Sequence, residues 1–484
     1  MHVAIALLLA ASAGATPAPE EAAAEISLSS GSPDALAAFR RGRDLFESSR
    51  EFEAKAQFEK AVALDARFAF AWAMLAQCPG VSEPAEKMDR AVALGAKLGV
   101  PERAMLDYWR ALQKGDDKAV EASLSHLGEL AAGDWRIELL LGERAVDAGR
   151  GEEAVKLFRR AVELNPQAAE AFNHLGFALS DLGQHDAAIT AMRRYAALKR
   201  DDPNPLDSLG EVLLRANRLE DAEAAFRKAS ANPQFWYAAA GVATARFFAG
   251  DFEGGRKALR EELPLAPDAS VKVRLQSYIA WTLLAEGRRA EGLAALDAAE
   301  EQARAASPAL HAQLAVTRGA FYVLAGEPEA ALPLLDAGLE RGTAKKLSGA
   351  EQNALRRSVA SWRIRALAQG GHAADAAKLL AALEAEAAGD RGLAAAQGLR
   401  AALAEAKGDA ATALAETTRC AQVDWLCRLQ RVRLASLKGD RAGADEAARA
   451  LLSERRRDTV WTSLEPTYLW VWVQLRPQAR AAAN

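Results

Sequence analysis

The sequence has few β-branched residues. Only six of its 484 residues are isoleucine and twenty-one are valine, whereas 115 are alanine. Alanine has the highest intrinsic helix propensity and β-branched residues prefer strands, so the composition predicts an all-α protein. The length corresponds to roughly three domains of about 150 residues each. A helical repeat array escapes that expectation, because each repeat packs only against its neighbours.

Other scarcities exclude whole classes of protein. Three cysteines are too few for a disulfide framework. A net charge of −4 argues against a nucleic-acid-binding surface. Half of the residues are hydrophobic and 26% are charged, which is not the composition of a disordered chain. No apolar run reaches the roughly 20 residues that a transmembrane helix needs, so we expect no transmembrane segment.

The N-terminus carries an apolar run over Val3–Ala13, followed by small residues spaced as at a signal-peptidase site. We therefore expect a signal peptide over 1–15, a mature start near Gly14 or Thr16, and a periplasmic or secreted location. The segment before the run lacks Lys and Arg, and the alternative is an alanine-rich N-terminal helix. The residues 16–33 are rich in Pro, Glu, Ser and Gly and predict a flexible linker.

The strongest pattern is a repeat with a period close to 34 residues. Counting from Trp135, small residues stand at positions 8 and 20, large apolar residues at 7 and 24, a glycine at 15 and a proline at 32. The corresponding residues are Gly142, Ala154, Leu141, Phe158, Gly149 and Pro166. Small residues let two antiparallel helices approach closely. Glycine ends the first helix and proline the second.

This pattern resembles the tetratricopeptide repeat (TPR), a 34-residue helix–turn–helix unit. The stretch Phe172–Phe177, with Asp202–Glu211, is similar to TPR arrays of bacterial regulatory proteins. The resemblance implies a right-handed superhelical solenoid of about twelve antiparallel helix pairs. We expect the array over 34–340, an insertion over 341–355, degenerate TPR-like repeats over 356–454 and a C-terminal capping segment over 455–484. Whether the solenoid is continuous across the insertion stays open.

Several motifs that resemble catalytic or cofactor sites fall on repeat positions. Gly149-x-Gly151-x-x-Ala154 matches a dinucleotide fingerprint, but it follows a predicted helix instead of a strand. The segment from Gly250 to Ala258 lacks the lysine and hydroxyl of a phosphate-binding loop. The histidines are scattered and show no metal-ligand spacing. We expect no enzyme activity, no cofactor and no metal.

Two cysteines, Cys420 and Cys427, lie seven residues apart at a turn between predicted repeats. In an oxidising compartment they could form a disulfide. Alternatively, Cys420 is a small buried residue at repeat position 27.

The resemblance also implies where a partner binds, because positions 2, 5, 9, 12 and 13 of the first helix line the groove of a TPR array. The matching residues form a mixed-charge groove with Phe177 and Trp281 as apolar points, suited to an extended or helical peptide. They are Arg136, Glu143, Asp147, Asn173, Phe177, Asp181, Asp207, Glu211, Arg215, Tyr237, Arg274 and Trp281. The aromatic members could instead pack against the next repeat.

The C-terminal region is basic and aromatic, with Arg455–Arg457 followed by Trp461, Tyr468, Trp470 and Trp472. It predicts a cap over the last repeat or a docking surface for an acidic or membrane partner. We therefore expect an exported, non-catalytic scaffold that binds a protein or peptide of unknown identity. The alternative is a structural assembly factor of an envelope complex that docks through this C-terminal surface.

Overall fold

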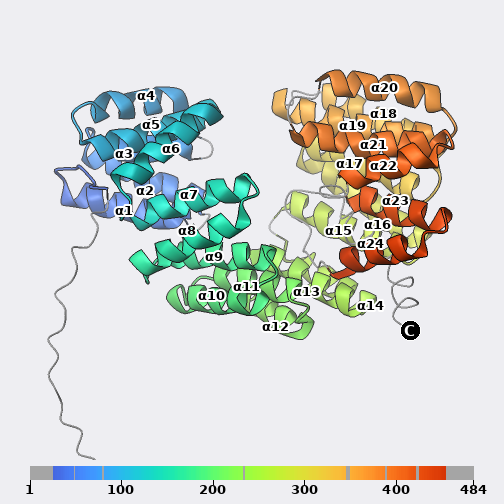
Figure 1. The fold of residues 1–484 in the computed structure, drawn as a ribbon, viewed down its shortest axis with the longest axis horizontal. Coiled ribbons are helices and arrows are strands. Elements are labelled where there is room, and N and C mark those ends of the chain that lie inside the picture. Colours follow the sequence, from blue (N-terminus) through green and yellow to red (C-terminus); the bar gives the residue numbers. More distant parts are fainter. Residues whose placement is uncertain are drawn as a thin grey trace, which may run out of the picture. The chain divides into compact units, whose positions relative to one another are not determined.

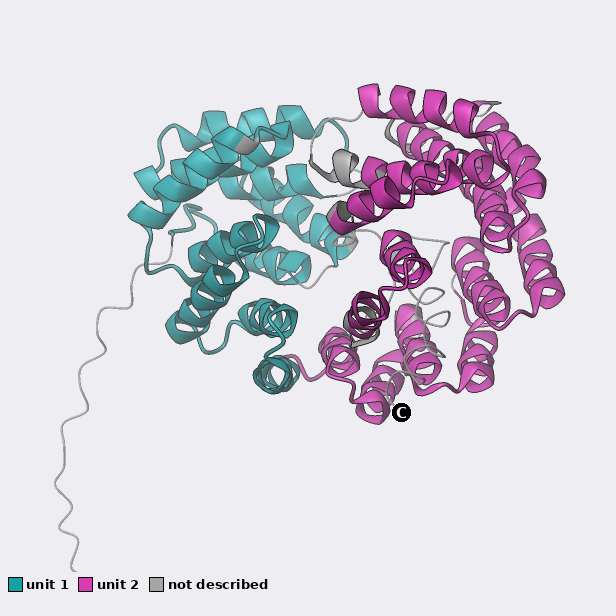
Figure 2. Ribbon diagram, turned by 45° about the vertical axis from the view of Figure 1, so that its right-hand side comes forward, with its two compact units in different colours: residues 1–198 teal, residues 199–484 magenta. Residues whose placement is uncertain are grey.

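The computed structural model describes residues 26–47, 50–78, 81–232, 235–266, 268–344, 349–386, 390–420 and 425–453. These residues form twenty-four α-helices and no strand, which confirms the all-α prediction (Figure 1). The chain divides into two compact units, residues 1–198 and 199–484, which are described separately (Figure 2).

The first unit contains ten helices among its described residues. They are α1 (Pro33–Glu47), α2 (Glu51–Leu64), α3 (Ala69–Gln77), α4 (Pro84–Gly95), α5 (Val100–Lys114), α6 (Asp117–Leu130), α7 (Trp135–Asp147), α8 (Gly151–Leu164), α9 (Ala169–Asp181) and α10 (His185–Leu198). The helix α3 is short, with nine residues.

The second unit contains fourteen helices among its described residues. They are α11 (Asn204–Arg215), α12 (Leu219–Ser230), α13 (Trp236–Ala249), α14 (Phe252–Glu262), α15 (Ala269–Ala285), α16 (Arg289–Ala306), α17 (Pro308–Leu324), α18 (Pro328–Ala344), α19 (Gly349–Gln369), α20 (Ala373–Glu386), α21 (Asp390–Ala406), α22 (Ala410–Cys420), α23 (Trp425–Leu437) and α24 (Arg441–Ser453).

Each odd-numbered helix packs against the even-numbered helix that follows it, giving twelve pairs, as predicted. Within each unit, one pair also stacks on the next, as α8 does on α9 and α16 on α17. This stacking of pairs buries the apolar face that a single helix pair would leave exposed. The fold is therefore a solenoid of antiparallel helix pairs.

Close approach within a pair depends on glycine at repeat position 8. A Cβ atom added at Gly142 would lie 2.6 Å from Cδ1 of Phe158, which is at position 24 of the same repeat. At Gly176 it would lie 2.7 Å from Cε of Met192, and at Gly210 2.8 Å from the ring of Phe226. These separations are shorter than carbon atoms tolerate, so the pairing of small with large residues is a steric requirement.

The turns between paired helices contain left-handed residues, as after α7 and α11. Gly149 has φ +72° after α7, and Asn217 has φ +59° at the same place after α11. Glycine adopts this conformation without a steric penalty, and asparagine is one of the few other residues that tolerate it. The predicted role of repeat position 15 is confirmed at Gly149.

Residues 341–355 do not form the separate insertion that we expected. Residues up to Ala344 continue α18, and those from Gly349 onward belong to α19. The lengthening of two helices, with residues 345–348 between them, accounts for the break in the sequence period.

The predicted flexible linker is wrong for residues 26–32, which lie against the first unit. The backbone N–H of Ile26 donates to Oδ2 of Asp134 at 2.9 Å. The hydroxyls of Ser27 and Ser29 donate to Oε1 of Glu102 at 2.8 and 2.6 Å. The side chains of Ile26 and Leu28 pack against the apolar core. The remainder of the linker and the predicted signal peptide lie outside the described residues, as does the capping segment 455–484.

The last described helix pair of the second unit shares an apolar cluster with helices that come much earlier in the sequence of the same unit. Val432 of α23 and Ala448 of α24 belong to the apolar cluster that contains Trp281 of α15 and Phe321 of α17. The second unit is therefore held together by a contact between repeats far apart in the sequence, in addition to the stacking of neighbours.

Candidate functional site

A half-buried group of charged and aromatic side chains spans three odd-numbered helices of the first unit. We call it the α7–α9 surface and define it by Glu47, Arg136, Glu143, His174 and Phe177. Nε of Arg136 lies 3.5 Å from Oε1 of Glu47, so α7 is bridged to the end of α1. Burial raises the pKa of Glu47, and Arg136 and Arg43 act in the opposite direction.

Glu143, the other carboxylate of this surface, has no lysine or arginine as an ion-pair partner among the described residues. Nε2 of His174 lies 3.4 Å from its Oε1. Burial, followed by the negative charges of Asp147 and Glu47, raises the pKa of Glu143 to about 7. Burial lowers the pKa of His174 to about 4, so this histidine is neutral at physiological pH. Near neutral pH, His174 is therefore uncharged and does not balance a negative charge on Glu143.

Aromatic rings surround this pair. The ring of His174 lies 5.5 Å from that of Phe158, and Arg136 lies over the ring of Trp135 at 4.1 Å. Tyr108 on α5 is buried; burial raises its pKa to about 12, with a further contribution from Glu143. The tyrosine is therefore a neutral hydroxyl close to the carboxylate.

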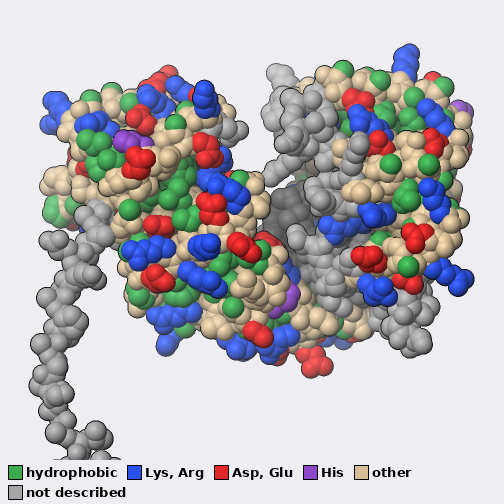
Figure 3. Space-filling model, viewed as in Figure 1, with side chains coloured by type: hydrophobic (Ala, Val, Ile, Leu, Met, Phe, Trp, Pro, Cys, Tyr) green, Lys and Arg blue, Asp and Glu red, His purple; other side chains and the backbone are tan. Residues whose placement is uncertain are grey.

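The structure brings the groove residues predicted on α7 and α9 into one region. Glu143, Asn173 and Phe177 are half-buried, whereas Asp147 and Asp181 are exposed. Asp147 lies 3.4 Å from Arg144, which also pairs with Glu121 at 2.7 Å. Basic and acidic side chains are interspersed on the face of the molecule that Figure 3 shows. The surface is thus of mixed charge, with an acidic centre at Glu143.

The groove residues predicted in the second unit have different environments. Glu211 pairs with Arg215 at 2.8 Å along α11, and the ring of Tyr237 packs 4.7 Å from that of Phe235. Asp207 is buried, with 5% of its surface exposed. Burial lowers the pKa of Arg274.

Trp281 is not the apolar point of a groove that we expected. Only 1% of its surface is exposed, and its ring makes an edge contact with Phe321 at 6.1 Å. Long helices in this part of the array bring α17 over the tryptophan. Its side chain belongs to the core and is closed to a partner.

Sequence reasoning missed Arg43, Glu47 and His174. Arg43 and Glu47 stand at positions 9 and 13 of the repeat that begins at Ala35, so the groove rule would have found them in the first repeat. His174 stands at position 6, which that rule does not include. Only the fold shows that its ring faces Glu143.

The two glycine motifs each begin on the turn between paired helices and continue into the second helix, α8 or α14. Arg256, in the second of them, is 1% exposed and lies 2.9 Å from Glu253 and 2.5 Å from Glu286. It thus joins α14 to the end of α15. No group of three or more His, Cys, Asp or Glu side chains suited to a metal ion occurs in the described part of the chain. No helix in that part is long and apolar enough to cross a membrane.

The two cysteines whose side chains are described, Cys78 and Cys427, differ in oxidation state. Cys78 is a buried free thiol, and burial raises its pKa to about 11. Cys427 is buried and disulfide-bonded. The side chain of Cys420 lies outside the described residues, so the bridge between Cys420 and Cys427 stays a prediction.

Comparisons with known proteins agree with this architecture. A family model described as tetratricopeptide repeat matches residues 139–203, the part of the chain that contains most of α7, all of α8 and α9, and α10. The small glutamine-rich tetratricopeptide repeat-containing protein 2 of Mycosarcoma maydis is 29% identical over 87 residues, which cover 18% of this chain. The match spans 25% of that relative's length.

Two solved structures are similar in part. A MamA protein is 23% identical, with a TM-score of 0.31, over 34% of this chain and 91% of its own. A tetratricopeptide repeat protein from Parabacteroides merdae is 17% identical, with a TM-score of 0.38, over 54% of this chain and 98% of its own.

The helix pairs, their positions of close contact and the stacking of successive pairs define the class of α-solenoid repeat proteins. Together with the family match over residues 139–203, they show that the chain contains tetratricopeptide repeats. Arrays of this kind are protein-interaction scaffolds and typically non-catalytic.

Proposed function

We propose that this chain is a non-catalytic scaffold and that its α7–α9 surface binds a peptide segment carrying a lysine or arginine. The observation that carries the proposal is Glu143, a half-buried carboxylate whose partner in the structure is the neutral His174. A basic side chain placed beside Glu143 would supply the missing positive charge.

The neighbouring side chains suit the remainder of such a segment. Phe177 is half-buried one turn after Asn173 on α9 and offers apolar surface. Oδ1 of Asn173 is buried without a hydrogen-bond partner among the described residues. Leaving such an atom unpaired costs about 1–3 kcal/mol, and rotation of the amide toward a bound backbone would recover part of that cost.

The proposal is tested with an array of peptides that vary in charge and apolar content. Peptides with a basic residue flanked by apolar residues should bind the wild-type chain, and the double variant Glu143→Gln, Phe177→Ala should lose them. Glu211→Gln in the second unit is the matched control and should leave binding unchanged. Equal binding by the double variant would place the peptide elsewhere and refute the proposal.

We also propose that the chain is exported before it meets its partner. The support is the apolar run at 3–13 and the small residues that follow it. N-terminal sequencing of the protein from a periplasmic or secreted fraction should find a start near Gly14 or Thr16. The alternative role in envelope assembly rests on residues 455–484, and truncation after Glu454 tests it. Lost assembly with intact peptide binding would favour that role.

A further inference from the structure

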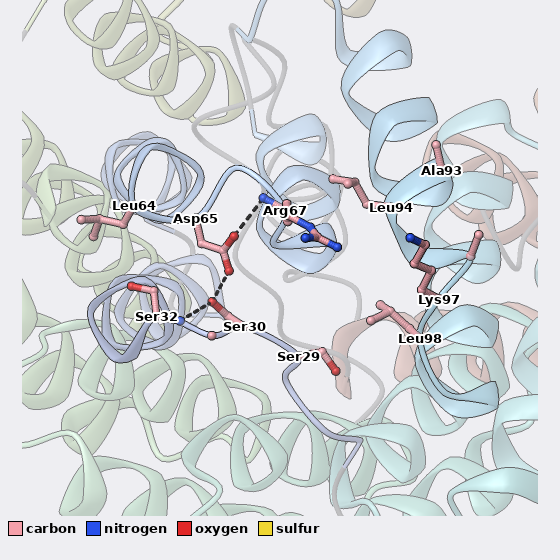
Figure 4. A pocket seen from close by; sticks show the side chains of 12 residues that line it. Ser29, Ser30, Ser32, Leu64, Asp65, Arg67, Ala93, Leu94, Lys97 and Leu98 are labelled. Atoms are coloured by element: carbon pink, nitrogen blue, oxygen red, sulfur yellow. Dashed lines mark hydrogen bonds between the residues drawn. The ribbon is translucent and has the colours of Figure 1, made fainter.

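An open hollow of about 790 Å³ lies in the first unit, away from the α7–α9 surface. Its wall is formed by residues 29–32, by the end of α2 with the loop after it, and by the end of α4 (Figure 4). Small-molecule sites are typically concavities of about 300–1,000 Å³, lined mainly by apolar groups with a few polar ones. The hollow has the size of such a site.

Two basic side chains reach into this hollow from different elements. Arg67 comes from the loop after α2 and Lys97 from the segment after α4, and Figure 4 shows their ends directed toward the same space. Neither side chain forms an ion pair or hydrogen bond with any of the described residues. Two positive charges are therefore available to a ligand.

Asp65, the carboxylate among the residues that line the hollow, already accepts two hydrogen bonds. Oδ2 of Asp65 accepts the hydroxyl of Ser30 at 2.5 Å, and Oδ1 accepts the backbone N–H of Arg67 at 2.9 Å. These hydrogen bonds hold the carboxylate in the loop. One bound carboxylate against two unpaired cations leaves the hollow with an excess of positive charge.

Apolar side chains complete the wall. Leu94 and Leu98 lie on either side of the space that the two cations share (Figure 4). Ala93 and Ala96 also line the hollow. A ligand that matches all of these groups has an anionic head and an apolar body. A multiply charged, fully polar anion such as inorganic phosphate would leave the leucines uncovered.

We infer that this hollow binds a fatty-acid-like carboxylate, with its head between Arg67 and Lys97 and its alkyl chain against Leu94 and Leu98. The pairing of a carboxylate with two cations fixes the head, and each methylene group that is buried against the leucines adds to the affinity. Affinity should therefore rise with chain length and require the charge.

The test is calorimetric titration of the full chain with dodecanoate below its micelle concentration, with hexanoate and with uncharged dodecanol. Dodecanoate should bind at least tenfold more tightly than either of the other two. The double variant Arg67→Gln, Lys97→Gln should weaken dodecanoate binding at least tenfold. Both side chains are exposed, so the variant should fold, which its circular dichroism spectrum checks.

Lys118→Gln, an exposed lysine on α6 outside the hollow, is the matched control and should bind dodecanoate as the wild type does. Absence of dodecanoate binding would overturn the inference, as would equal binding by the double variant or by dodecanol. Neither Arg67 nor Lys97 belongs to the α7–α9 surface. Failure here therefore leaves the peptide proposal standing, and the reverse also holds.

Discussion

Nε2 of His174 lies 3.4 Å from Oε1 of Glu143, yet the two residues do not form an ion pair near neutral pH. Burial raises the pKa of Glu143 to about 7 and lowers the pKa of His174 to about 4. Between these values a mostly protonated carboxyl faces a neutral imidazole. A change of pH around 7 therefore changes the charge of Glu143 and leaves His174 neutral.

Glu143→Gln should stabilise the protein at pH 8 and change little at pH 5. The pKa of Glu143 lies above its ordinary value of 4.5, so the folded state holds the proton more tightly than the unfolded state. The resulting stability is present below pH 4.5 and is lost as pH rises through about 7. Thermal unfolding of both proteins from pH 5 to pH 8 measures the effect. Glu152→Gln, at an exposed site on α8, is the control, and a difference that does not vary with pH would contradict the assignment.

Binding of a basic peptide to the α7–α9 surface should strengthen as pH rises from 6 to 8. Glu143 gains its negative charge over this range, and the ionised fraction of a group with a pKa of about 7 increases about tenfold. Fluorescence anisotropy should therefore show an association constant up to about tenfold higher at pH 8. The Glu143→Gln variant should lack this dependence. A wild-type affinity that is flat across the range would exclude Glu143 as the contact.

Gly142→Leu should destabilise the first unit by about 1–3 kcal/mol, because its side chain would overlap the ring of Phe158. The matched control is Gly128→Ala, whose added Cβ would meet Leu141 at an ordinary 3.4 Å. Chemical denaturation measures both variants. Unchanged stability of Gly142→Leu would mean that α7 and α8 do not pair through this position.

Arg256→Ala should destabilise the second unit by about 1–3 kcal/mol, since Glu253 loses a hydrogen-bonded cation, Glu286 loses an ion-pair partner and a buried side chain is removed. Arg260→Ala is a suitable comparison: Arg260 pairs with Glu253 at 2.7 Å but is half-exposed. Exposed pairs contribute about 0–1 kcal/mol. Equal effects of the two substitutions on the unfolding midpoint would show that burial of Arg256 is energetically unimportant.

The double variant Ser27→Ala, Ser29→Ala should loosen the docked segment 26–32. Glu102 is 5% exposed and would lose two hydroxyl donors, at a cost of about 1–3 kcal/mol. Limited proteolysis should then cleave near these residues at a higher rate, whereas Ser125→Ala at an exposed site on α6 should not change the rate. Identical cleavage of all three proteins would show that the hydroxyls do not hold the segment.

The repeat could be predicted from the sequence because its constraints are local. Gly142 and Phe158 are only sixteen residues apart, and the close approach of their helices leaves room for no larger residue at the first position. The same reasoning located the turn at Gly149 and predicted about twelve helix pairs. The alanine content reflects these contacts and the general preference for helix.

Other features depended on residues distant in the sequence. Asp134 and Glu102 bind the segment 26–32 across intervals of 108 and 75 residues, which no local pattern encodes. Residues 341–355 were expected to be an insertion because the period is lost there, although helices can lengthen without keeping the period.

The sequence by itself determined the class of fold, the helix pairs and their close contacts, since propensity and steric fit act over one repeat. Only the tertiary structure decided which predicted groove residues are accessible. Trp281 is covered by α17, whereas Glu143 stays half-buried beside a neutral histidine. Burial and charge at a residue depend on every helix packed around it, and those helices come from separate repeats.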